Sequence, residues 1–371
     1  MAVYITILLS VMFVSALGQN SAIEKPVRLG QCIEKRKIPS LLTTVIICAI
    51  LIFFFAARWN VGTDYPNYFL RFGKLLAMNI PDLVGGRDWG FDVFTAFVGQ
   101  YVFTNFFLYC ILLGALIYIP VVLTYRRFSS DYTMTYALYI LMCLYTWPYN
   151  GMRQSVAVSL LFLAFPFLYE RKNWWKFIAI AAIAYTFHST ALLVIPFILI
   201  CKLKPWKKPF IFVCLLIVVL IIFLPGLWTT IIDFLDSIGQ SKMAEDYADF
   251  EELRAGVNFI RIVVAAVPVF LSFVFYPTLK SNNKHIDFII NMCVMNLIFL
   301  LCGNRLTIMA RFATYFNVAL PLLVPEFVKV FKNDSKGFAR GLIYIAYFGH
   351  MLILLPNDSG LLPYRFIFGH I

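Results

Sequence analysis

Residues 174–201 read WWKFIAIAAIAYTFHSTALLVIPFILIC, an apolar run that carries a single histidine, His188, near its middle. Basic clusters flank both ends of this run, at 171–176 and at 202–208. Because basic loops stay on the cytoplasmic side of a membrane, both ends should lie on that side and the run should fold back on itself. Each arm then has about 13 residues, or about 20 Å of helix, which is shorter than the ~30 Å hydrocarbon core. The turn at His188 should therefore be recessed below the outer surface.

The composition places the whole chain in the membrane. Its 371 residues are 61% hydrophobic, 18% aromatic and 13% charged, with a mean hydropathy of +0.82. A soluble domain of this length would need far more charge on its surface, and the short alternating segments of a β-barrel are absent. We expect an all-α, polytopic integral membrane protein. The net charge of +12 lies mostly in short loops between apolar segments, so nucleic acid is not expected as a partner.

Apolar segments of spanning length recur from end to end. The run at 2–18 has no basic residues before it, so we interpret it as a retained span with its N-terminus outside, not as a signal peptide. Residues 90–104 are more weakly apolar and are expected to form a re-entrant or interfacial helix, which leaves most of the 31 Lys and Arg residues on the cytoplasmic side. We expect one transmembrane domain over 1–371, with substantial outer loops at 58–104 and 226–257. The expected spans, about twelve, are 2–18, 39–57, 105–124, 132–149, 152–169, 174–187, 189–201, 209–225, 258–278, 286–302, 308–328 and 338–355.

Ionisable residues cluster at the outer ends of these segments, and such residues usually mark function in membrane proteins. The stretch Arg58–Tyr65 combines a cation, the carboxylate of Asp64 and the permissive Gly62. It could bind an anion or a sugar, with Asp64 orienting Arg58 or accepting from sugar hydroxyls. Equally, Arg58 could snorkel at an interface beside aromatic residues. The residues alone leave these two interpretations open.

For Arg153 and His188, the sequence favours a functional role over a purely structural one. Arg153 lies in the first turn of a helix that begins after Pro148 and Gly151. A helix N-terminus favours anions and disfavours a cation, so a bound phosphate would offset the cost of this arginine. A lone histidine is usually a core residue, but one at an outward-facing turn is suited to act as a general base for a hydroxyl.

Arg305 and Arg311 form the last candidate group. Arg305 lies in a break between spans and Arg311 about one turn into the next span, so they converge only if Arg305 precedes the helix. No Asp, Glu or Lys lies in the middle of a span, which disfavours an ion-coupled transporter. The eight cysteines are scattered, and no metal or cofactor is expected. A diphosphate would have to be neutralised by arginines, whose planar fork suits phosphate oxygens.

These residues resemble the pattern of the EpsG family, whose members are similar to Wzy-type polysaccharide polymerases of bacterial envelopes. The similarity runs in order over roughly residues 40–320. Asp88-Trp89 stands where a glutamate-proline type of sequence would be expected. The matching pieces are Arg58-x3-Gly62-x-Asp64-Tyr65-x2-Tyr68, Gly90-Phe91, Gly151-x-Arg153-Gln154 with Ala157, His188-x-Thr190 and Arg311-x3-Tyr315.

The resemblance implies an enzyme of the bacterial cytoplasmic (inner) membrane that joins lipid-linked repeat units at the periplasmic or outer face. Donor and acceptor would be glycans on undecaprenyl diphosphate. The fold would be similar to that of membrane glycosyltransferases that use polyprenyl phosphate donors. Partners would include membrane lipid and either a chain-length regulator or other glycan-assembly proteins.

The candidate residues divide into three roles under this hypothesis. His188 and Asp64 would be catalytic. Arg58, Arg153, Arg305 and Arg311 would hold the diphosphate, and Tyr65, Tyr68, Gln154 and Tyr315 would contact sugar. Two other functions stay open: a flippase or exporter of lipid-linked glycans, and a multi-pass acyltransferase with a catalytic histidine.

Overall fold

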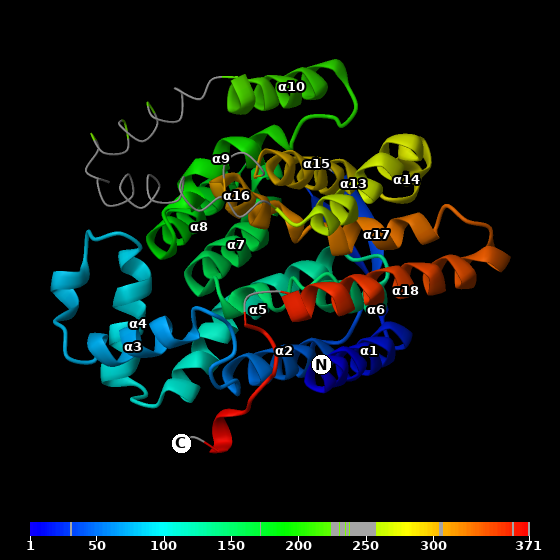
Figure 1. The fold of residues 1–371 in the computed structure, drawn as a ribbon. Coiled ribbons are helices and arrows are strands. Elements are labelled where there is room, and N and C mark those ends of the chain that lie inside the picture. Colours follow the sequence, from blue (N-terminus) through cyan, green and yellow to red (C-terminus); the bar gives the residue numbers. More distant parts are fainter. Residues whose placement is uncertain are drawn as a thin grey trace. The chain divides into compact units, whose positions relative to one another are not determined.

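The fold is mostly helical (Figure 1). The structure, a computed structural model, describes residues 1–29, 32–170, 172–223, 257–303, 307–357 and 360–369, together with Thr230, Phe234 and Ser237. The contacts group the chain into two compact units, Met1–Leu192 with Phe331–Ile371, and Leu193–Val330. The predicted outer loop 226–257 lies almost entirely outside the described residues.

The first unit is a bundle of helices with one short hairpin. Its antiparallel strands, β1 and β2, pair Lys25 with Arg36, and the sequence did not predict them. The 3-10 turns are Ile80–Leu83, Trp147–Tyr149, Phe165–Tyr169 and Ile367–Gly369. The main elements are α1 (Ala2–Asn20), β1 (Ile23–Leu29), β2 (Cys32–Ile38), α2 (Leu41–Ala56), α3 (Tyr65–Leu75), α4 (Trp89–Tyr101), α5 (Phe106–Phe128), α6 (Tyr132–Leu141), α7 (Met152–Ala164), α8 (Trp174–Phe187), the start of α9 (Thr190–Ile200) and α18 (Asn333–Asn357).

Among its described residues, the second unit contains the remainder of α9 and six further helices. Buried residues concentrate on α15 and α17, which form its core. The elements are α10 (Lys208–Phe223), α13 (Phe259–Val274), α14 (Tyr276–Asn282), α15 (Ile286–Gly303), α16 (Thr307–Asn317) and α17 (Leu320–Val328).

The helices confirm a multi-pass membrane protein. Among the described residues, five helices are long and apolar enough to cross a bilayer, and the bent pair α13–α14, with an angle of 85°, makes a sixth. Shorter apolar helices are Leu41–Ala56, Trp174–Phe187, Thr190–Ile200 and Lys208–Ile221. The number twelve stays a prediction: the helix expected at 132–149 ends at Leu141, and 308–328 is divided between α16 and α17.

Helix ends follow the local chemistry of the sequence. The Asn105 side chain accepts hydrogen bonds from the backbone N–H groups of Phe107 and Leu108 at the start of α5. Asp131 caps α6 in the same way through the N–H of Met134. These side chains satisfy donors that a helix leaves unpaired in its first turn. Arg126 and Arg127 lie in the last turn of α5, where the helix dipole favours cations.

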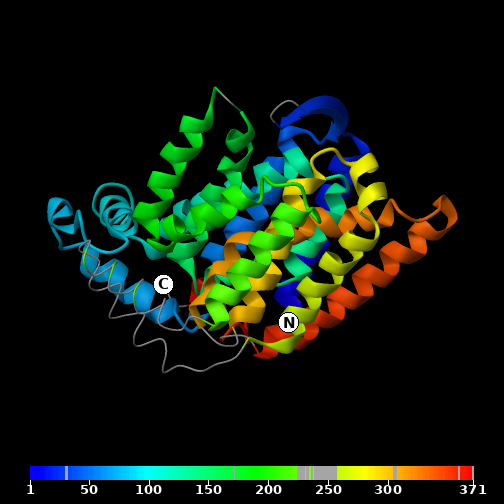
Figure 2. The ribbon, with the colours of Figure 1, turned by 90° about the horizontal axis from the view of Figure 1, so that it is seen from above.

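The helices of the first unit pack in sequence-adjacent and sequence-distant pairs. Helix α5 packs on α2 and α7, α1 packs on α6, and α18 packs on α6. Helices α7 and α8 lie side by side, as Figures 1 and 2 show. Helix α8 ends at Phe187, His188 is extended at φ −156° and ψ 116°, and α9 begins at Thr190. The predicted break at His188 is confirmed.

The C-terminal segment returns to the loop after α2. The N–H of Trp59 donates to the carbonyl of Arg365 at 2.8 Å, and the N–H of Ile367 donates to Ala57 at 2.8 Å. The N–H of Gly62 donates to the carbonyl of Gly360 at 2.9 Å. These bonds fix the backbone of residues 57–62 from a part of the chain about 300 positions away.

The start of α4 approaches the end of α8 closely at Gly90. A Cβ atom on Gly90 would lie 2.2 Å from Thr186 Oγ1 and 2.9 Å from the backbone carbonyl carbon of Thr186. Backbone cannot move aside as a flexible side chain can. Gly90 is therefore required for this contact.

We expect Gly90→Ala to force α4 away from α8 and to lower the free energy of unfolding by about 1–3 kcal/mol. Thermal unfolding of the purified protein in detergent measures this loss. Gly73→Ala is the matched control, because nothing lies within 4 Å of its Cβ position and alanine favours a helix. An unchanged melting temperature for Gly90→Ala would contradict the close approach.

Candidate active site

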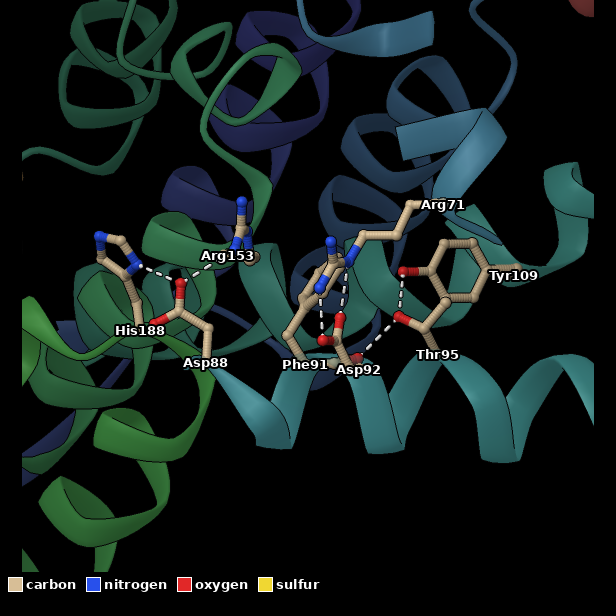
Figure 3. Close-up of polar contacts among 8 residues, drawn as sticks. All are labelled: Arg71, Asp88, Phe91, Asp92, Thr95, Tyr109, Arg153 and His188. Atoms are coloured by element: carbon tan, nitrogen blue, oxygen red, sulfur yellow. Dashed lines mark hydrogen bonds and ion pairs between the residues drawn. The ribbon is translucent and has the colours of Figure 1, made fainter. Parts of the chain in front are cut away.

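The carboxylate of Asp88 lies at the centre of the site, buried with 3% of the residue exposed. Its Oδ1 accepts the backbone N–H of Ser189 at 2.8 Å. Its Oδ2 lies 3.2 Å from Nδ1 of His188 and 3.1 Å from Nη1 of Arg153. Figure 3 shows Asp88 between these two side chains. One carboxylate thus joins the start of α4, the start of α7 and the break between α8 and α9.

The backbone conformations at Asp88 and His188 direct their side chains toward each other. Asp88 precedes α4 with φ 54°, in the left-handed region, and its side chain makes no capping bond to that helix. A non-glycine residue adopts this conformation rarely, and Asp is among those that tolerate it best. The carboxylate is therefore directed to α7 and to the α8–α9 break, where His188 terminates α8.

The contacts of Asp88 fix its charge. Burial alone raises the pKa of a carboxyl group, but the hydrogen bond and charge of His188, the charge of Arg153 and the N–H of Ser189 outweigh burial. Together they hold the pKa of Asp88 well below its usual range. An ionised Asp88 accepts the proton on Nδ1 of His188, so in the neutral ring Nε2 carries the lone pair.

A second carboxylate–arginine pair lies one helical turn along α4. Nε of Arg71 donates to Oδ1 of Asp92 at 2.7 Å, and Nη2 donates to Oδ2, so the pair is bidentate. Asp92 is 8% exposed. Beside it, Thr95 shares a 2.9 Å hydrogen bond with Tyr109 of α5. Figure 3 shows both pairs along α4.

A cavity of about 340 Å³ opens beside these pairs. Three of its lining side chains are cations, Arg71, Lys74 and Arg153, against the one carboxylate of Asp64. Tyr68 also lines it, and its hydroxyl donates to the backbone carbonyl of Asn150 at 3.5 Å. The volume falls within the range of about 300–1,000 Å³ that is typical of small-molecule sites. The complete lining is Asp64, Asn67, Tyr68, Leu70, Arg71, Lys74 and Arg153.

Asn150 ties the cavity rim to the start of α7. Its Oδ1 accepts from the N–H of Asp64 at 3.3 Å and from Oγ1 of Thr63 at 3.3 Å. Gly62 has φ 97°, and a Cβ there would lie 2.7 Å from Asn150 Oδ1. Only glycine permits both this backbone conformation and this approach.

Arg58 does not line the cavity. It is fully buried, and its guanidinium lies over the rings of Phe55, Tyr149 and Tyr65 at 4.0, 4.6 and 5.6 Å. Nη1 donates to the carbonyl of Phe55. Tyr65 is also buried, in an aromatic group with Trp59. The structure therefore places neither side chain on the wall where Asp64, Tyr68 and Arg153 lie.

The remaining predicted residues lie elsewhere. Gln154 is buried on α7 in the first unit. Arg311 and Tyr315 lie on α16 in the second unit, where Tyr315 is buried. Arg305 lies outside the described residues. The diphosphate and sugar roles of Arg305, Arg311, Gln154 and Tyr315 remain predictions.

The structure changes the interpretation of Arg153. The sequence suggested that a phosphate would offset the cost of a cation at a helix N-terminus. Asp88 already offsets that cost at 3.1 Å, while 34% of the Arg153 side chain stays exposed. Arg153 is thus held by one anion and lines a cavity that can receive another.

Sequence reasoning did not identify Asp88, Arg71, Lys74 or Asp92 as site residues. Asp88 had one signal, its place two residues before the Gly90-Phe91 pair. Arg71 and Lys74 had no such signal, because basic residues are common on helices in polar loops. Arg71 and Lys74 are three positions apart and so share one side of α3, but only the packing of α3 on α4 places that side at the cavity.

Comparison with protein-family models matches residues 41–366 to the EpsG family. The match covers most of the chain and includes all the residues that line the cavity. No curated protein and no solved structure matches the chain.

We expect Asp88→Asn to lower stability at neutral pH by about 3 kcal/mol, because it removes one partner from a buried charged cluster. The low pKa of Asp88 contributes stability that is present above the ordinary value of about 3.9 and is lost as the pH falls toward the folded value. Acidification should therefore destabilise the variant less than the wild type.

Thermal unfolding in detergent from pH 7 to pH 4 and below measures both effects. Asp82→Asn replaces an exposed acid and is the control, with melting temperatures close to those of the wild type. Parallel acid dependence in wild type and Asp88→Asn would show that Asp88 does not carry this linkage.

Proposed function

Because the chain belongs to the EpsG family, we propose that it is a polysaccharide polymerase that joins undecaprenyl-diphosphate-linked repeat units at the outer face of the cytoplasmic membrane. The family supports a polymerase-like role in general. The observation that carries the finer proposal is the Asp88–His188–Arg153 cluster beside a cavity lined by three cations.

The cations suit a diphosphate. Arg71 and Arg153 present planar forks, and Lys74 adds a compact charge on the same wall. Asp92 and Asp88 hold the two arginines from behind, so the forks are positioned before a ligand arrives. Preorganised charges of this kind stabilise the negative charge that develops on a leaving diphosphate. Arg305 and Arg311 stay proposed as further diphosphate ligands.

His188 suits a general base. Its Nδ1 is engaged by Asp88, so Nε2 is the nitrogen that takes a proton. In the proposed step, Nε2 removes the proton from a hydroxyl of the acceptor sugar as that oxygen bonds to the anomeric carbon of the donor. The bond between that carbon and the diphosphate breaks, and the electron pair leaves with undecaprenyl diphosphate. Asp88 stabilises the imidazolium that forms.

The sugar would lie toward the rim formed by α3. Asp64 and Tyr68 present a carboxylate and a phenol to the cavity, and both groups bond sugar hydroxyls readily. Arg58 is buried and does not touch the sugar; it would position the cavity rim by holding the loop that leads to Asp64. A chain-length regulator, or other assembly proteins, would act on the polymer outside this cavity.

We expect His188→Gln to abolish long-chain polymer, because loss of a general base costs about 10²–10⁴ in rate. The measurement is complementation of a deletion strain followed by gel analysis of surface glycan, which should show a single repeat unit. His350→Gln is the control, since His350 lies on α18 against the carbonyl of Leu141. Normal polymer from His188→Gln would refute the catalytic role, and a surface without any repeat unit would favour an exporter.

We expect Lys74→Gln to raise KM for the lipid-linked donor about threefold to fivefold and to change kcat little, because an exposed cation contributes on the order of 1 kcal/mol of binding. Polymerisation by the purified protein in detergent, with varied donor, measures both constants. Lys332→Gln removes an exposed lysine outside the cavity and should leave them unchanged. Equal constants for Lys74→Gln and wild type would remove Lys74 from the binding wall.

A further inference from the structure

We propose that the second unit binds an anionic phospholipid, with an acyl chain in the groove between α10 and α15 and the phosphate on the lysines that precede α10. This lipid is bound and not consumed, so the inference goes beyond the polymerase proposal. It rests on residues that have no part in the cavity of the first unit.

The groove is apolar throughout its described lining. It has a volume of about 210 Å³. Helix α10 packs on α15, and the other side of α10 carries exposed apolar side chains such as Phe212 and Leu216. A helix of this kind faces lipid. The lining of the groove includes Trp206, Phe210, Cys214, Leu215, Val294 and Ile298.

Lysines gather at one end of this groove. The segment from Cys201 to Lys208 contains four of them, and no acidic residue occurs between 201 and 223. Lys204, Lys207 and Lys208 are exposed. Basic residues beside a membrane helix attract anionic headgroups, each increasing affinity about fivefold. An apolar groove that ends at a cationic loop matches the two parts of a phospholipid.

Trp206 joins the two parts. It lies between the lysines and has φ 61°, a rare conformation for a large side chain. This conformation sets its ring against Phe273 of α13 at 5.4 Å and along the groove. Among the described residues the indole N–H has no hydrogen-bond acceptor. This nitrogen is itself buried, so Trp206 would contact the lipid through the apolar part of its ring, which lines the groove beside the lysines.

Charge favours a phospholipid over the polyprenyl substrate. Basic loops are cytoplasmic, so the lysine loop at 202–208 should face the cytoplasmic leaflet. The proposed chemistry takes place at the outer face. A headgroup on these lysines therefore belongs to a phospholipid of the inner leaflet.

The test uses quenching of tryptophan fluorescence in the full-length protein in detergent. Brominated phosphatidylglycerol and brominated phosphatidylcholine are titrated separately, and the signal of Trp206 is the difference between wild type and Trp206→Phe. We expect half-maximal quenching of Trp206 at a mole fraction of phosphatidylglycerol at least tenfold lower than of phosphatidylcholine.

The lysines are tested by replacing Lys204, Lys207 and Lys208 with glutamine together. This change should abolish the preference for phosphatidylglycerol. The matched control replaces Lys35 and Lys37, exposed lysines of the β1–β2 hairpin, and should retain it. If the triple variant does not fold, the comparison of the two lipids on the wild type decides alone.

Three results would overturn the proposal. The first is equal quenching of Trp206 by both lipids, and the second is an undiminished preference in the folded triple variant. The third is displacement of brominated phosphatidylglycerol by undecaprenyl phosphate at an equal mole fraction, which would assign the groove to an isoprenoid. None of these results depends on polymerase activity.

Discussion

A buried carboxylate cannot be left without partners, and this constraint at Asp88 organises the first unit. Transfer of an ionised group from water into protein costs several kcal/mol unless hydrogen bonds and opposite charge replace the water. Asp88 obtains them from the N–H of Ser189, the ring of His188 and the guanidinium of Arg153. These partners come from α7 and the α8–α9 break. The position of the imidazole is therefore coupled to that of the arginine, because movement of either side chain would remove a partner from the buried carboxylate of Asp88.

Two aspartates at the start of helix α4 each hold an arginine through an ion pair. Asp88 and Asp92 are four positions apart, which places them about one turn apart along the helix. Each binds an arginine that also lines the cavity, Arg153 from α7 and Arg71 from α3. Because the acids are buried behind the arginines, they fix the geometry of the cations without covering the cavity. Helix α4 thus has a structural part in the site, although it was expected only as a re-entrant or interfacial helix.

Arg58 shows how a residue of a family motif can act without touching the cavity. Its charge lies among aromatic rings, where cation–π attraction replaces part of its lost hydration. The C-terminal segment bonds to the backbone on both sides of Arg58, at Ala57 and Trp59. The loop that leads to Asp64 is consequently held by a buried cation and by the end of the chain. This arrangement gives Arg58 a positioning effect on the rim.

The sequence by itself determined the membrane class, the helical fold, the break at His188 and the family, because apolar length, basic loops and ordered short motifs are local properties of the chain. It also identified Arg153, Asp64 and Tyr68, which the structure places on one wall. Only the tertiary structure decided that Asp88 holds His188, that Arg71 and Lys74 join the cavity, and that Arg58 lies behind it. Those contacts join residues 65 to 101 positions apart or depend on which helix packs against which. Hydrophobic periodicity shows that a helix will bury a face, but the partner of that face is chosen by the packing of the whole unit.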